Sequence, residues 1–165
     1  MAETDFFVNL DPDLQMQEPA LRDLYAYWTK KRGDRQLPSR NDIDPLELGP
    51  YLPNIILIEV QAEPLRLRYR LVGTAITQAM QRDSTGRYYD EIYSEEVLDG
   101  IYRSFRWIIE HRAPLRTHGR TFYPDTNFYD YETLNLPLSR DGTTVNMVLG
   151  GLYFRLLEGL APDPS

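Results

Sequence analysis

Residues 65–74 read LRLRYRLVGT, and this stretch alternates strictly between apolar and basic residues up to position 71. Strict alternation over seven residues is typical of a half-buried β-strand, whose successive side chains point to opposite faces. We therefore expect positions 65, 67, 69 and 71 to face the core and the arginines at 66, 68 and 70 to face outward. Gly73 ends the strand. The preceding segment 54–60, rich in isoleucine on both faces, predicts the partner strand of a hairpin.

Beyond Gly73 the pattern changes from alternation to helical spacing. Residues 74–81 predict a short helix, and Ser94 suits the N-cap of a longer helix whose apolar stripe runs from Leu98 to Ile109. Three further strands are expected over residues 115–123, 128–138 and 143–155. Strands on either side of one helical insertion predict an α+β fold, with a five-stranded antiparallel sheet and helices on one face.

An additional amphipathic helix is expected over residues 18–33, before the sheet begins. Its apolar positions have helical spacing, and basic residues precede Gly33 at its end. The stripe has two possible partners, the outer face of the same sheet or a second copy of the chain. The second possibility gives a candidate homodimer interface made of Leu21, Leu24, Tyr25 and Trp28. Residues 1–17 and 157–165 show no period, so we expect a loosely ordered N-terminus, one domain over 18–156 and a tail.

Composition narrows the classes of function. Of 165 residues, 42% are apolar and 26% charged, which is typical of a globular chain. A net charge of −7 disfavours binding to nucleic acid or anionic lipid. No stretch approaches the roughly 20 apolar residues that span a bilayer, and residues 1–9 do not resemble a secretory signal. We therefore expect a cytoplasmic protein that does not insert into membranes.

Three motifs, in this order, carry a family resemblance: YRLVGT at 69–74, DSTG at 83–86 and LPLSRDG at 136–142. With the segments around 24–28 and 52–53, they resemble the PAS superfamily, and in particular stand-alone single-domain PAS-like proteins found mainly in alphaproteobacteria. The resemblance spans about residues 19–156. It implies a small enclosed pocket and a sensory or regulatory module that is not an enzyme and acts through contacts with an unidentified signalling protein.

Two other classes of function remain open at this stage. One is a small cone-shaped α+β enzyme of the ketosteroid-isomerase type, which needs a buried acid or base in an apolar pocket. The other is an adaptor without a ligand, whose pocket is filled by side chains. The long helix falls between strands in this sequence, whereas the cone fold places its helices before most strands. Element order therefore favours the PAS-like fold.

The candidate ligand-binding residues are mainly aromatic, because rings offer a large contact area and, in tyrosine, a polar tip. Core packing explains the same rings without a ligand. The arginine row at 66, 68 and 70 suits an acidic ligand or partner, or else a solvated face with salt bridges, and Arg70 is the member chosen as functional. The predicted set is Tyr69, Arg70, Tyr88, Tyr89, Tyr93, Tyr102, Phe105 and Asn135.

The cofactor is unknown from sequence, but several can be set aside. The chain has no cysteine, so disulfides, iron–sulfur clusters, Cys-ligated zinc and a flavin–cysteinyl adduct are excluded. Haem ligation by His111 or His118 is not expected, since a cation at the helix C-terminus explains His111 without a ligand. No metal site is predicted.

Overall fold

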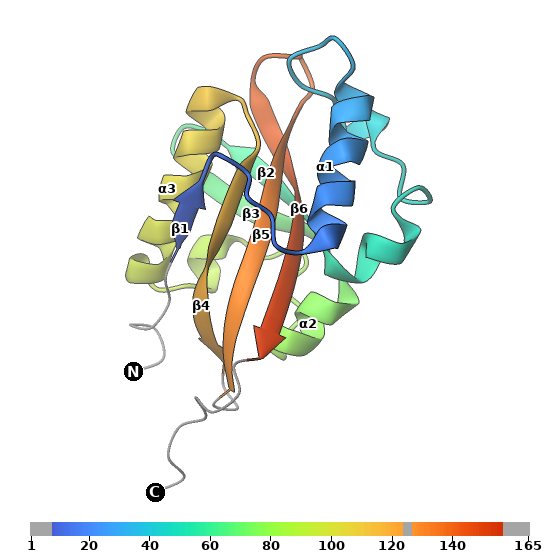
Figure 1. Cartoon of the computed structure of the whole chain (residues 1–165). Coiled ribbons are helices and arrows are strands. Elements are labelled where there is room, and N and C mark those ends of the chain that lie inside the picture. The colour runs from blue at the N-terminus through green and yellow to red at the C-terminus, as the bar shows by residue number, and fades with distance from the viewer. Residues whose placement is uncertain (1–7, 124–126, 157–165) are drawn as a thin grey trace, which may run out of the picture.

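The computed structural model describes residues 8–123 and 127–156. One antiparallel sheet runs through the molecule in the order β1-β4-β5-β6-β2-β3 (Figure 1). The mixed α+β fold is as predicted from the sequence. The strands are β1 (Asn9–Asp11), β2 (Ile55–Gln61), β3 (Arg66–Val72), β4 (Leu115–Tyr123), β5 (Asn127–Ser139) and β6 (Val145–Leu156).

The sheet has six strands and not the predicted five, because β1 pairs antiparallel with β4. This strand lies in the stretch 1–17 that was expected to be loosely ordered. A three-residue strand shows no period, and its conformation is fixed by pairing with residues more than a hundred positions away, such as Asn9 with His118. Residues 1–7 and the predicted tail 157–165 lie outside the described residues.

The predicted hairpin is formed by β2 and β3, with one irregularity. Leu67 and Tyr69 are buried on the inner face, as the alternation indicated. The register then shifts, so that Ile58 lies opposite Tyr69 and Leu57 lies opposite Leu71. This bulge places Leu71 on the outer face, where 38% of it is exposed, and not on the face of Tyr69 as predicted.

The helical elements lie in two stretches of the chain, one between β1 and β2 and the other between β3 and β4. Ser94 caps α3, because its Oγ accepts a hydrogen bond from the Val97 N–H at 3.4 Å. Gly73, between β3 and α2, lies so close to the 3-10 turn before β2 that an added Cβ would meet the Pro53 carbonyl oxygen at 2.3 Å. The helices are α1 (Pro19–Arg32), η2 (Arg40–Asp42), η3 (Gly49–Asn54), α2 (Thr74–Met80), η4 (Tyr89–Glu91) and α3 (Glu95–His111).

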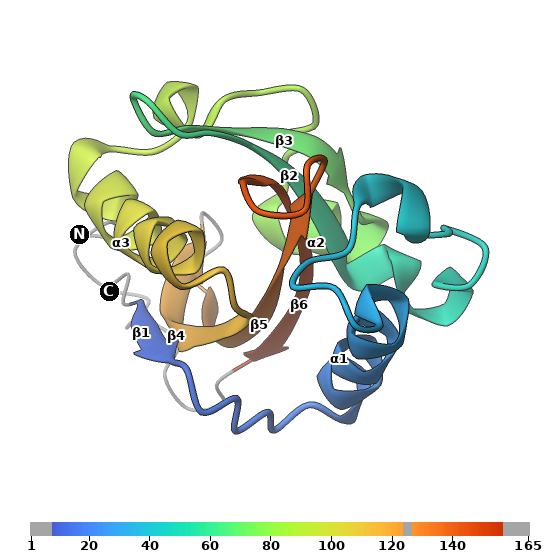
Figure 2. The same ribbon diagram turned by 90° about the horizontal axis from the view of Figure 1, so that it is seen from above.

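Helix α1 covers the outer face of its own sheet, on the opposite side from α3 (Figure 2). Leu21, Leu24 and Trp28 are buried, and the Trp28 Nε1–H donates to the Pro137 carbonyl at 3.0 Å. Gly151 of β6 allows this close approach, since an added Cβ would lie 2.7 Å from Leu21.

Of the two possible partners of the stripe, α1 therefore packs on the outer face of the same sheet, and its buried side chains offer no surface to a second chain in this arrangement. Only Tyr25 of the four is half-buried. A dimer through this stripe would require α1 to leave its own sheet.

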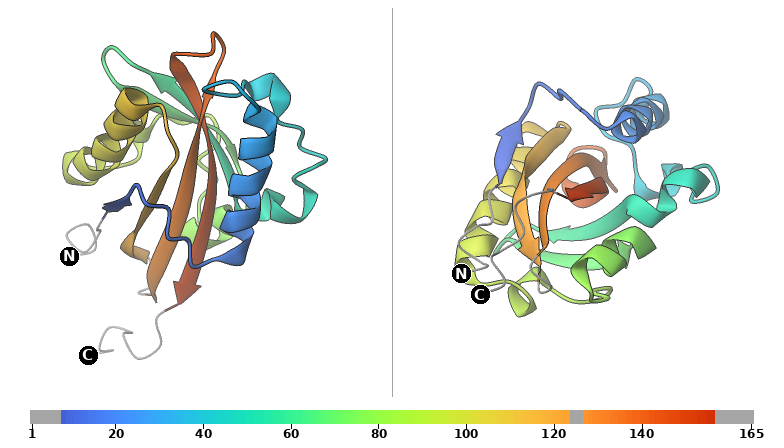
Figure 3. Two further views of the ribbon diagram at one scale, coloured as in Figure 1. Left: turned by 45° about the horizontal axis from the view of Figure 1, so that its top comes forward. Right: turned by 60° about the horizontal axis from the view of Figure 1, so that its bottom comes forward.

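The other face of the sheet is covered by α2, η4 and α3. The sheet curves strongly around this side, as the two views of Figure 3 show. In the described part of the chain, no helix is both long enough and apolar enough to cross a membrane.

Candidate functional site

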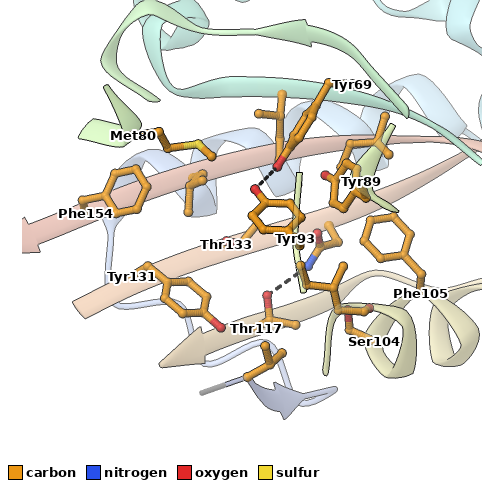
Figure 4. A pocket seen from close by; sticks show the side chains of 16 residues that line it. Tyr69, Met80, Tyr89, Tyr93, Ser104, Phe105, Thr117, Tyr131, Thr133 and Phe154 are labelled. Carbon is orange, nitrogen blue, oxygen red and sulfur yellow. Dashed lines mark hydrogen bonds between the residues drawn. The ribbon is translucent and has the colours of Figure 1, made fainter. Parts of the chain in front are cut away.

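A cavity of about 100 Å³ lies between the inner face of the sheet and the helices that cover it (Figure 4). Direct cross-strand partners point to the same face of a sheet, so Thr133 lies beside both Thr117 and Leu152 in the cavity wall. Strands supply Ile56, Ile58, Tyr69, Thr117, Tyr131, Thr133, Asn135, Leu152 and Phe154; helices and loops supply Val8, Met80, Tyr89, Tyr93, Ile101, Ser104 and Phe105.

Four rings form one wall of the cavity. Tyr69 stacks on Tyr89 with ring centroids 4.2 Å apart, and Tyr89 meets Tyr93 and Phe105 edge-on at 5.6 and 6.4 Å. The hydroxyls of Tyr69 and Tyr93 are hydrogen-bonded at 2.7 Å. Burial raises the pKa of Tyr89 well above its ordinary value, so its phenol stays neutral. The wall is therefore tightly packed and uncharged.

Hydroxyl and amide groups occupy the floor. The Asn135 Nδ2 donates to the Leu115 carbonyl at 2.9 Å and to the Thr117 Oγ1 at 3.3 Å, and Asn135 is buried. The Ser104 Oγ donates to the Ile101 carbonyl at 2.6 Å, within its own helix. These contacts hold the polar groups in fixed orientations around the cavity.

No aspartate, glutamate, histidine, lysine or arginine occurs among the described residues that line the cavity. The acid or base that a cone-type enzyme needs is therefore not part of this wall. The cavity can accept hydrogen bonds from a ligand and donate them, but it offers no charge to balance an ionised one.

Five of the eight predicted ligand-binding residues come together in the cavity wall: Tyr69, Tyr89, Tyr93, Phe105 and Asn135.

The other three lie elsewhere. Tyr88 lies under the guanidinium of Arg66, 3.5 Å from its ring centroid, where its backbone bridges to the edge strand β3. Tyr102 follows Ile101 on α3 and so is rotated about 100° away from the cavity-facing side of the helix. Arg70 lies at the bulge of β3, with 65% of its side chain exposed.

The arginine row makes ion pairs on the outside of the molecule. Arg66 contacts both oxygens of Asp90, at 2.7 and 3.2 Å. Arg68 pairs with Glu59, which also lies 3.7 Å from Arg70. The reading as a solvated face with salt bridges fits these contacts, and the row does not reach the cavity.

The two histidines are also away from the cavity. His111 ends α3, where its Nδ1 lies 2.9 Å from the Trp107 carbonyl oxygen and its ring stacks on that indole. His118 lies on β4, across from Glu132 and on the other face of the strand from Thr117.

Several wall residues were not among the sequence candidates. Tyr131 and Thr133 could have been found, because they alternate with Asn135 on one strand and so share its face. Ser104 lies one helical turn after Ile101 on α3, so the two residues share one side of the helix. No pattern in the sequence singles out Met80 or Val8, which reach the cavity through the packing of the chain.

Residues 16–153 match the family model described as PAS domain. A solved structure of an RNA-binding light-oxygen-voltage receptor is similar with a TM-score of 0.53 and 11% identity; the match covers 89% of this chain and 38% of that one. A structure of a variant of RsLOV is matched with a TM-score of 0.46 and 10% identity, over 87% of this chain and 72% of the other. No curated protein matches.

The present chain thus spans well under half the length of the receptor, and at 11% identity the likeness is one of fold alone. The family match, in contrast, runs through α1, strands β2 to β5, most of β6 and all the helices that cover the cavity. The chain belongs to the PAS domain family.

Proposed function

We propose that this PAS domain is a cytoplasmic sensory or regulatory module whose cavity binds a small, uncharged aromatic molecule. The observation that carries the proposal is the cavity itself: about 100 Å³, lined by six aromatic rings and by no charged side chain among the described residues. An ionised ligand would lose its hydration there without gaining a counter-charge. A neutral ring would gain contacts on several sides.

The volume sets the size of the ligand. An apolar protein cavity of about 150 Å³ is large enough for benzene. The present cavity, at about 100 Å³, is smaller, so a single ring would enter it only with shifts of the surrounding side chains. Sites for drug-sized ligands are typically about 300–1,000 Å³. A flavin or a haem is larger than a cavity of this volume, and the chain also has no cysteine for a flavin adduct.

The polar groups favour a ring that carries one hydroxyl. The Tyr69–Tyr93 hydroxyl pair and Thr117 lie on different parts of the wall (Figure 4), and the Thr117 hydroxyl accepts a hydrogen bond from Asn135. A hydroxyl can both donate and accept, so a phenol can join either pair without leaving a buried group unsatisfied. We therefore choose 4-fluorophenol as the probe.

The output of the module is proposed to be contact with another protein. The part of the outer sheet face that α1 leaves uncovered carries Arg70 and Leu71, which are exposed at the bulge of β3. Glu59 is the one carboxylate that pairs with both Arg68 and Arg70 among the described residues. This local excess of cations, in a chain of net charge −7, suits an acidic surface on the partner.

Binding of 4-fluorophenol can be tested by ¹⁹F NMR with a pair of variants at one position. Ser104→Leu adds carbon atoms to the cavity, whereas Ser104→Ala leaves the space open. We expect line broadening with the wild-type protein and with Ser104→Ala, and its loss with Ser104→Leu. Absence of broadening with the wild type, or equal broadening with all three proteins, would contradict the proposed ligand class and favour an adaptor without a ligand.

A further inference from the structure

One wall residue of the cavity comes from the short N-terminal segment that precedes α1. Val8 lines the cavity and directly precedes β1. It packs against α3 at Gly100, where an added Cβ would lie 3.3 Å from the Val8 Cγ2. The segment that ends the sheet at the β4 edge therefore also supplies part of the cavity wall.

The side-chain hydrogen bonds that hold the start of this segment are exposed. Strand β1 has three residues and pairs on one side only, at the end of the sheet. The Arg103 Nη2 donates to the Val8 carbonyl at 2.7 Å, and this contact is exposed. Of the other strands in the wall, β3 is also at an edge of the sheet, but it has seven residues and pairs with β2 from Arg66 to Val72, and the rest are paired on both sides. Local opening costs least where a short edge element has few buried contacts, so β1 is the easiest wall to move.

A buried ion network fastens the segment further along. The Arg116 Nη1 lies 3.0 Å from the Asp11 Oδ2, and the Arg116 Nε donates to the Glu132 Oε2. Glu132 in turn accepts the backbone N–H groups of Gln17 and Glu18, each at 2.8 Å. The network thus joins the end of β1 to the residues that lead into α1.

We propose that residues 8–11 form the gate of the cavity. Two contacts hold this gate shut, the Arg103–Val8 hydrogen bond and the Arg116–Asp11 ion pair. A ligand enters and leaves when β1 separates from β4, and the network passes this movement to the start of α1. The identity of the ligand rests on the proposed function, but the gate can be tested without any ligand.

The absence of cysteine makes a direct test of access possible. A single Ser104→Cys exchange places a thiol in the cavity wall, and methyl methanethiosulfonate, a small uncharged reagent, is added in excess. The rate of labelling is followed by mass spectrometry. We expect slow labelling in this background and at least a tenfold faster rate when Arg103→Ala or Asp11→Asn is added.

Arg66→Ala is the matched control, because it also removes an arginine from an exposed contact but lies on β3, away from the gate. Its labelling rate should stay within twofold of the background. Urea unfolding of each variant gives the labelling rate that is expected if global unfolding alone exposes the thiol. The measured labelling rates of the gate variants should be higher than this rate.

Equal rates in all variants, or increases that only follow global unfolding, would overturn the gate. The two proposals fail separately. Faster labelling of the gate variants without 4-fluorophenol binding would support the gate and contradict the proposed ligand class. Binding of 4-fluorophenol with unchanged labelling rates does the reverse.

Discussion

The two faces of strand β5 differ in how they are filled. On the outer face, Leu134, Leu136 and Leu138 are fully buried beneath α1 and the chain that follows it. On the inner face of the same strand, Thr133 and Asn135 are also buried, but they border a cavity. The outer side is closed by interdigitating aliphatic side chains, and the inner side by stiff rings that meet without filling the space. We therefore expect packing on the outer face of the sheet to contribute most to stability, and side chains on the inner face to have more room to move.

The largest expected effect contrasts two leucines on opposite faces. Leu136→Ala should lower the free energy of unfolding by about 3–4 kcal/mol, because a fully buried side chain is lost from close packing. Leu152→Ala, at the cavity and only half-buried, should cost about 1–2 kcal/mol. Urea unfolding measures both. Equal losses in the free energy of unfolding for the two variants would show that the two faces of the sheet are packed equally tightly.

The ion network at the outer face should give the next largest effect. Glu132→Gln is expected to cost about 2 kcal/mol, less than the full loss of a buried ion pair, because Arg116 keeps Asp11 as a partner. Measurement is again by urea unfolding at pH 7. A cost below about 0.5 kcal/mol, typical of surface pairs, would show that the network does not anchor the segment.

The same variant should change the pH dependence of stability. Burial raises the pKa of Glu132, but hydrogen bonds from the Gln17 N–H and Arg116 outweigh this and hold the pKa below its ordinary value of 4.5. A lowered folded-state pKa means that the stabilisation is complete above 4.5 and is lost as the pH falls through the folded value. Stability of the wild type should therefore fall more steeply below pH 4.5 than that of Glu132→Gln.

The smallest effects come from adding carbon atoms to each face. Gly151→Ala should cost about 1–2 kcal/mol, because the new methyl group would crowd Leu21 and Leu24. Ser104→Leu adds more carbon but has a cavity to receive it, so the cost should stay below about 1 kcal/mol. Thermal unfolding of the two variants compares them directly. A larger loss for Ser104→Leu would mean that the inner face is as tightly packed as the outer.

Regular periods in the sequence were enough to predict most of the fold. The alternation at 65–71 located β3, and the stripes of α1 and α3 located the two long helices. The sequence did not predict features that depend on pairing with distant residues or on a break in the alternation of a strand. The pairing partners of β1 are far along the chain, and the bulge beside Arg70 reverses the face of Leu71 without a signal in the sequence.

The candidate site was predictable to the extent that aromatic character and cavity lining coincide. That holds for Tyr69, Tyr89, Tyr93 and Phe105, which face the cavity from four different places in the chain. It fails for Tyr88 and Tyr102, because composition does not reveal on which side of the backbone a ring lies. Val8 could not be predicted, since its place in the wall depends on where β1 docks.

The anchoring of the first elements to the last has a consequence for synthesis on the ribosome. Trp28 is joined to Pro137, 109 positions later, and Asp11 to Arg116, 105 positions later. Residues 8–32 therefore emerge long before their partners, and the apolar stripe of α1 stays uncovered until β5 and β6 have been made. The sheet of this domain can therefore be completed only after β6 has been made, and its non-local pairings are expected to make folding slow.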